Sequence, residues 1–146
     1  MTAVLLANVT CVAVSGRGIL IEGPPGSGKS SLALALIDRG AVLVGDDGVA
    51  LERVENRLLL HPPPHIAGKI EIRGVGIADI ATMSAPLCLV LALGVQGERL
   101  PVPATATIEG VSVPSLALGL GSDEGAALRA EWALRLHGLP LPADFA

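Results

Sequence analysis

The chain has 146 residues and a formal net charge of −4 at pH 7; 51% of its residues are hydrophobic, yet it has one Trp, one Phe and no Tyr. This length suits a single domain, residues 1–146, whose core must be built from Ala, Val, Leu and Ile. The acidic balance and the lack of aromatic stacking platforms argue against a nucleic-acid partner, which normally meets a basic surface.

The first half of the chain is predicted to contain strands and one helix. Apolar runs at Ala7–Ser15 and Gly18–Glu22 flank a two-residue turn and predict a hairpin. Residues Lys29–Arg39 are rich in helix formers, and Gly40 suits the position just after a helix end. The run Ala41–Asp47 predicts a buried strand that ends in two aspartates.

The middle of the chain is also predicted to be rich in strands. Residues Val49–Val54 and Arg57–His61 predict a second hairpin, and a proline-rich loop, His61–Ile70, leads into a strand at Glu71–Ile77. The run Leu87–Gly94 is strand-sized rather than the ~20 apolar residues that a membrane-spanning helix needs. We therefore interpret it as a central strand and expect no membrane association.

The last third is predicted to hold short edge strands and a helix. Residues 102–118 alternate apolar and polar side chains and are punctuated by prolines, which favours edge strands. A helix is predicted at Ser122–His137, with Ser122 as its N-cap and Asp123 and Glu124 in its first turn. The order of elements as a whole predicts an α/β fold.

The cysteines and the N-terminus bear on the compartment. Cys11 and Cys88 lie far apart in apolar runs, where buried free thiols are more common than a disulfide or a metal pair. No signal peptide is recognisable, so the reducing cytoplasm is the expected location.

The stretch GPPGSGKS lies between the strand Gly18–Glu22 and the helix Lys29–Arg39. In this pattern, backbone N–H groups wrap a phosphate, a lysine reaches the β- and γ-oxygens, and a hydroxyl ligates Mg²⁺. A helix that begins after the loop adds free N–H groups and partial positive charge. The sequence therefore predicts a site for ATP and Mg²⁺. Its expected residues are Gly23, Pro24, Pro25, Gly26, Ser27, Gly28, Lys29, Ser30 and Ser31.

Asp46 and Asp47 follow a buried strand, at the place where ligand crevices form in open α/β sheets. Two adjacent carboxylates allow a division of labour, because one can serve the metal while the other takes a proton from an incoming hydroxyl. The alternative is that one or both only cap the turn in GDDG.

Glu71 and Arg73 stand two residues apart in KIEIRGVGI and would share one face of a strand. There Glu71 could join the shell of the metal and Arg73 could neutralise the transferring phosphate. The alternative is a solvated ion pair on an exposed strand.

His61 and His65 flank three prolines. Without a cysteine or carboxylate partner close in sequence, two such histidines are more typical of loop residues than of a metal site.

The blocks GPPGSGKS, LVGDDGVAL and IEIRGVGI together resemble the catalytic domain of bacterial HPr kinase/phosphorylase. The block EIRGVGI resembles the signature of that family alone, whereas many unrelated nucleotide enzymes share the loop. The resemblance is clear over Ala7–Gly97. It implies a P-loop α/β domain, strand-rich with a Walker A helix, akin to the nucleotide-binding part of phosphoenolpyruvate carboxykinase.

The activity that the resemblance implies is phosphorylation, by ATP, of a seryl hydroxyl on the phosphocarrier protein HPr of the sugar or nitrogen phosphotransferase system. It also implies removal of that phosphate by phosphorolysis, and it allows for a homo-oligomer and for a role of the proline-rich loop in binding HPr. Carried over by position, the roles are phosphate and metal binding for Lys29 and Ser30, base and acid for Asp46, metal support for Asp47 and Glu71, and stabilisation of the transferring group for Arg73. The order of the two aspartates is our choice.

Three departures from the family pattern suggest alternatives. Asn8 stands where the family commonly has a histidine, the chain looks like the compact form without an N-terminal domain, and the basic glycine-containing loop has no clear match. A nucleotide- or phosphate-sensing regulatory module with weak catalysis is therefore the second hypothesis. A small-molecule P-loop kinase is the third, and it is disfavoured because the arginines are scattered and form no lid.

Overall fold

The computed structural model describes residues 3–119 and 125–145. The described strands are β1 (Val4–Ala7), β2 (Thr10–Val14), β3 (Arg17–Glu22), β4 (Val42–Gly45), β5 (Gly48–Val54), β6 (Arg57–His61), β7 (Lys69–Ile72), β8 (Gly76–Asp79), β9 (Ala85–Ala92), β10 (Ala104–Ile108) and β11 (Val111–Ala117). The helices are α1 (Lys29–Asp38), α2 (Ala126–His137) and a short 3₁₀ turn, η1 (Ala143–Phe145). This strand-rich α/β content agrees with the fold class that the sequence predicts.

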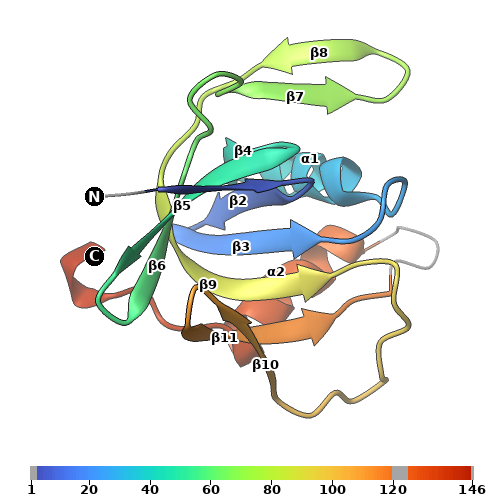
Figure 1. Ribbon diagram of the computed structural model, residues 1–146. Helices are drawn as coiled ribbons and strands as arrows, with labels where there is room; N and C mark the ends of the chain where they lie inside the picture. The colour runs from blue at the N-terminus through green and yellow to red at the C-terminus, as the bar shows by residue number, and fades with distance from the viewer. Residues whose placement is uncertain (1–2, 120–124, 146) are drawn as a thin grey trace.

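One large sheet forms the body of the molecule, in the order β1-β5-β6-β9-β3-β2-β4 (Figure 1). Its centre is parallel, since β9 runs parallel to β3 on one side and to β11 on the other. The remaining pairs in it are antiparallel, including the predicted hairpins β2–β3 and β5–β6. Strands β7 and β8 form a separate two-stranded hairpin that stands off the main sheet.

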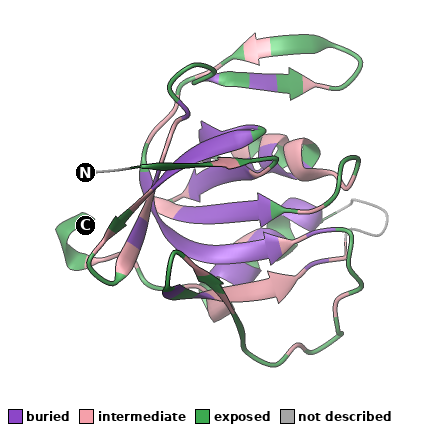
Figure 2. Cartoon of the chain, viewed as in Figure 1, coloured by how far each residue is buried: buried purple, intermediate pink, exposed green. Residues whose placement is uncertain are grey.

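The core lies on both faces of this sheet, as the alternation of side chains along β3 illustrates. Ile19 and Ile21 belong to a cluster that includes buried side chains of α1 and α2, whereas Leu20 belongs to a cluster with β5, β6 and β11. The period of two is that of a strand buried on both faces. Burial is concentrated in the central strands, while the β7–β8 hairpin is mostly exposed (Figure 2).

Both cysteines are free and buried, which confirms the prediction of free thiols. Burial raises the pKa of the Cys11 and Cys88 thiols above its ordinary value. Neutral thiols of this kind behave as small apolar core residues.

Three predicted boundaries are wrong for local reasons. The run Ala7–Ser15 is not one strand, because Asn8 takes a left-handed φ of 62° between β1 and β2. The run Glu71–Ile77 is not one strand either, because a turn separates β7 from β8. Gly74 takes a φ of 77° in that turn, which glycine does without the steric cost of a Cβ.

The C-terminal third differs from its prediction in one strand and one helix. Strand β11 pairs with both β10 and β9, so only β10 is an edge strand. Helix α2 starts at Ala126 with Gly125 at its N-cap, rather than at Ser122. The predicted cap Ser122 and the acidic pair Asp123 and Glu124 lie outside the described residues.

Candidate active site

Three strands bring the predicted site residues to one edge of the sheet. Strand β3 ends at Glu22 and β4 ends at Gly45, and β2 lies between them, antiparallel to both. The first residue of β2, Thr10, therefore lies at the edge where its two neighbours end. As a result, the glycine-rich loop after β3 and the two aspartates after β4 are close in space.

The loop before α1 has the conformation that its glycines allow. Gly23, Gly26 and Gly28 have φ values of 154°, 79° and 99°. Gly28 is the N-cap of α1 and offers no side-chain hydrogen bond, so the first backbone N–H groups of the helix are not capped by a side chain. The Lys29 ammonium donates hydrogen bonds to the carbonyls of Gly23 (2.7 Å) and Pro24 (3.2 Å), which folds it back along the loop.

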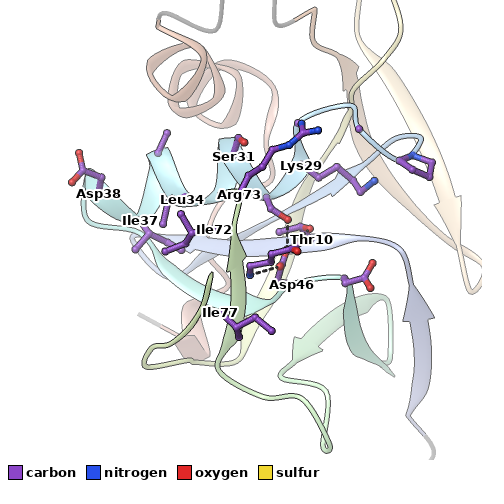
Figure 3. A pocket seen from close by; sticks show the side chains of 17 residues that line it. Thr10, Lys29, Ser31, Leu34, Ile37, Asp38, Asp46, Ile72, Arg73 and Ile77 are labelled. Carbon is purple, nitrogen blue, oxygen red and sulfur yellow. Dashed lines mark hydrogen bonds between the residues drawn. The ribbon is translucent and has the colours of Figure 1, made fainter. Parts of the chain in front are cut away.

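Asp46 is a buried carboxylate that accepts three hydrogen bonds. Its Oδ1 accepts from the hydroxyls of Ser30 (2.7 Å) and Thr10 (3.0 Å), and its Oδ2 accepts from the backbone N–H of Glu71 (3.3 Å) (Figure 3). Asp46 is 8% exposed and Thr10 is 1% exposed. Because a buried carboxylate is costly unless it is hydrogen-bonded, these donors fix both the position and the orientation of Asp46.

Asp47 has the opposite environment, although it is the next residue. It is exposed and takes a left-handed φ of 60°. Its carbonyl accepts a hydrogen bond from the backbone N–H of Asn8 (3.2 Å), whereas its carboxylate has no hydrogen bond to any other residue that the structure describes. The tight turn therefore holds the backbone of Asp47 and leaves its carboxylate available to a ligand.

The β7–β8 hairpin brings the third predicted block to the same place. Glu71 lies near the end of β7, and Arg73 lies in the turn beyond it rather than on the strand, so the expected shared strand face is wrong. Both side chains are exposed, and no ion pair joins them within the described chain. Arg73 extends from the tip of β7 toward the start of α1 (Figure 3).

These residues line one open pocket of about 1280 Å³. Of the predicted site residues, Gly23, Pro24 and Ser27 do not line it. The predicted residues in its wall are Pro25, Gly26, Gly28, Lys29, Ser30, Ser31, Asp46, Asp47, Glu71 and Arg73.

The wall also includes residues that sequence reasoning missed. Thr10 is one, and the available signal was a hydroxyl side chain in an otherwise apolar strand. The others form an aliphatic part of the wall that no motif marks; its larger side chains are Leu34, Ile37, Ile72 and Ile77.

The donor set of the pocket suits a hard cation, because hydroxyl and carboxylate oxygens are the ligands that Mg²⁺ prefers. Within residues 3–119 and 125–145, however, no three His, Cys, Asp or Glu side chains converge on a metal position. This fits Mg²⁺, which takes one or two protein oxygens and completes its shell with water and phosphate.

His61 ends β6 rather than lying in the loop that follows. Its Nδ1 is 2.7 Å from the hydroxyl of Ser84, and its Nε2 is 3.2 Å from a carboxylate oxygen of Glu52. The tertiary structure thus supplies a carboxylate partner that is not evident from the neighbouring sequence. His65 is exposed, and neither histidine lines the pocket.

Neither helix in the described ranges has the length and hydropathy of a membrane span.

The chain is similar to known proteins in both sequence and structure. The family model of the HPr Serine kinase C-terminal domain matches residues 2–85. An HPr kinase/phosphorylase of Clostridium beijerinckii is 47% identical over 72 residues, which are 49% of this chain and 24% of the relative. One of Limosilactobacillus reuteri is 35% identical over 132 residues, which are 80% of this chain and 41% of the relative.

Each match thus spans less than half of the curated relative. Among solved structures, the Hpr(Ser) kinase/phosphatase from Coxiella burnetii superposes with a TM-score of 0.79 at 28% identity, covering 90% of this chain and 88% of that one. Since the family model matches more than half of the residues, the chain belongs to the HPr Serine kinase C-terminal domain family.

Proposed function

We propose that this chain is an ATP-dependent serine kinase that acts on an HPr-like phosphocarrier protein in the cytoplasm and that the same site runs phosphorolysis in reverse. The observation that carries the proposal is the position of the Asp46–Ser30 hydrogen bond, beside the glycine loop and in one pocket with Asp47 and Arg73. The names of the relatives and of the structural neighbour, HPr kinase/phosphorylase and Hpr(Ser) kinase/phosphatase, support the same activity. We further propose that residues 1–146 form one catalytic domain, which acts alone or as a homo-oligomer.

The proposed cofactor is ATP, bound by its phosphates at the start of α1. The positive φ angles of Gly26 and Gly28 and the uncapped helix start suit an anion in this place. A short rotation of the Lys29 side chain away from the carbonyls of Gly23 and Pro24 would let it reach the β- and γ-oxygens. We therefore propose a P-loop nucleotide fold with α1 as its Walker A helix, akin to the nucleotide part of phosphoenolpyruvate carboxykinase.

Mg²⁺ is the proposed metal, with the hydroxyl of Ser30 as its ligand and the Asp46 carboxylate behind it. When bound, it would neutralise charge on the β- and γ-phosphates. The 2.7 Å hydrogen bond from Ser30 to Asp46 orients the serine oxygen for that role. Glu71 lines the same pocket and is the proposed further carboxylate in the metal shell.

The hydrogen bonds favour an order of the two aspartates opposite to our sequence-based choice. Asp46 is engaged by Ser30, Thr10 and a backbone N–H, which places it on the metal side and ties up its oxygens. Asp47 is exposed in the pocket, where its carboxylate can meet a seryl hydroxyl. We therefore propose Asp47 as the base for the serine hydroxyl, and as the acid in the reverse direction.

Arg73 is the proposed stabiliser of the transferring phosphoryl group. It lies at the tip of a hairpin whose strand β7 is held at the site by the hydrogen bond from the Glu71 N–H to Asp46. A guanidinium that approaches from this tip would meet the negative charge that the transition state spreads over the equatorial oxygens.

The test is incubation of the purified chain with Mg-ATP and with HPr from the organism that encodes it, followed by the mass of HPr. We expect a gain of one phosphate. In Asp47→Asn the rate should fall by roughly 10²–10⁴-fold while ATP still binds, because a general base is lost. In Asp46→Asn the concentration of Mg²⁺ needed for half-maximal rate should rise, because the metal side loses its charge.

Equal Mg²⁺ dependence in both variants would contradict the proposed order of the aspartates. Binding of ATP by the wild-type chain without any transfer to HPr would instead support the regulatory module. Asn8 gives that alternative a structural basis, since it contacts the backbone of Asp47 but has no titratable group.

A further inference from the structure

The pocket has a second part that the proposed roles leave unused. Beyond Ser30, the next turns of α1 contribute Leu34 and Ile37 to its wall, and the hairpin contributes Ile72 and Ile77 from the opposite side. In Figure 3 these four side chains lie on the side of Asp46 that faces away from Lys29. We call this set, Leu34, Ile37, Ile72 and Ile77, the aliphatic end of the pocket.

The aliphatic end offers little to a phosphate. Asp38 is the charged side chain that lines the pocket beside it, and a carboxylate repels an anion. Neither aromatic residue of the chain lines the pocket, so a nucleobase would find no stacking partner in this wall. The wall instead provides branched aliphatic surface from two separate elements, which is suited to another aliphatic side chain.

The direction of phosphoryl transfer decides which molecule reaches this end. In an in-line displacement, the attacking oxygen and the leaving nucleoside diphosphate lie on opposite sides of the phosphorus. The glycine loop and Lys29 are the proposed holders of the nucleotide, so the acceptor must approach from the opposite side, past Asp46 and Asp47. The aliphatic end lies on that approach.

We infer that the aliphatic end is a recognition site for the protein substrate, and that it binds an aliphatic side chain next to the serine that is phosphorylated. This inference rests on the proposed kinase activity and adds a determinant of substrate choice to it. Burial of such a side chain would hold the serine hydroxyl against Asp47 and would exclude water from the reacting groups. A serine without an aliphatic neighbour would be a poor acceptor.

Two exposed residues of the same hairpin provide a matched pair for the test. Ile77 is 71% exposed and lines the pocket, whereas Val75 is 80% exposed in the turn and does not line it. Both are β-branched and neither belongs to the core, so Ile77→Ser and Val75→Ser should fold alike, which circular dichroism would check. Steady-state kinetics with Mg-ATP and HPr then give separate KM values for the protein and for the nucleotide.

For Ile77→Ser we expect the KM for HPr to rise about tenfold or more, because a large aliphatic contact is lost from binding, while kcat and the KM for ATP stay unchanged. Val75→Ser should match the wild type in all three constants. An Ile77→Ser enzyme that also matches the wild type would overturn the inference. A rise in the KM for ATP instead would assign the aliphatic end to the nucleoside and would also overturn it.

A double-mutant cycle adds a test from the side of the substrate. Mass spectrometry locates the phosphorylated serine of HPr, and an aliphatic residue within two positions of it is then replaced by alanine. The loss on this HPr variant should be smaller for Ile77→Ser than for the wild type, because the two side chains act through one contact. Additive losses would contradict the inference, whereas a wild-type chain that transfers no phosphate to any HPr would refute the proposed function itself.

Discussion

The edge of the sheet that carries the pocket and the C-terminal region, β10–β11–α2, differ in what their side chains do. Every residue in the wall of the pocket lies between Thr10 and Ile77. The C-terminal region contributes buried apolar residues such as Ala130 and Leu134, which pack with α1 on one face of the sheet. The difference teaches that the reacting groups come from turns at the ends of strands, while the later elements keep those strands in place.

The contact between the two regions is made by both packing and hydrogen bonds. Arg17, at the start of β3, donates to the carbonyls of Leu134 (3.2 Å) and Leu139 (3.0 Å and 2.6 Å) around the C-terminal end of α2. Cations in this place also interact favourably with the helix dipole. The end of β3 opposite the glycine loop is thus tied to the C-terminal region.

The largest effect should come from a core residue of the C-terminal region. Leu134→Ala removes a side chain that is 2% exposed, so the free energy of unfolding should fall by about 2–5 kcal/mol, measured by urea denaturation. At a temperature at which the variant is folded, its KM for ATP should equal that of the wild type. Leu136→Ala, on the same helix but 71% exposed, should change stability little. A changed KM for ATP would show that the two regions are not separate in function.

A smaller effect, on chemistry and stability together, is expected at the pocket. Thr10→Val keeps the shape of the side chain but removes a donor from the buried Asp46 carboxylate, so the free energy of unfolding should fall by roughly 1–3 kcal/mol and kcat should fall severalfold. Thr10→Ser retains the hydroxyl and should keep kcat near the wild-type value. Equal kcat values for the two variants would indicate that Thr10 only fills space.

The smallest effect is expected where the C-terminal tail meets the sheet. Arg57 donates two hydrogen bonds to Asp144 (2.7 Å and 2.9 Å), and they hold the pKa of that carboxyl below its ordinary value. This stabilisation is present above the pKa of an unfolded aspartate and is lost as the pH falls through the lower folded value. Thermal unfolding from neutral pH into acid should therefore show a slightly steeper loss for the wild type than for Asp144→Asn. Because the pair is exposed to solvent, the difference should shrink in high salt, and a difference that persists there would contradict this assignment.

Much of the fold could be predicted because its signals are local. The hairpins β2–β3 and β5–β6, the helix after the glycine loop and the buried strand β9 follow from side-chain periodicity and turn residues within short windows. The failures also have local causes, namely the left-handed Asn8 and the turn at Gly74, which divide runs that are apolar throughout. Periodicity alone does not reveal a single residue of unusual φ.

The candidate site was predicted in its membership but not in its geometry. Spacing and residue type marked the glycine loop, Asp46, Asp47 and Glu71, because such chemistry requires these residue types in a fixed order. Tertiary structure decided that Asp46 is buried against Ser30 and Thr10 while its neighbour Asp47 is exposed, since that depends on how β2 and β4 lie beside each other. It also assembled the aliphatic end from α1 and a hairpin that lies more than thirty residues away along the chain. A sequence determines which groups are present, but burial and direction arise only when distant strands and helices pack, because both are properties of the surroundings rather than of the residue.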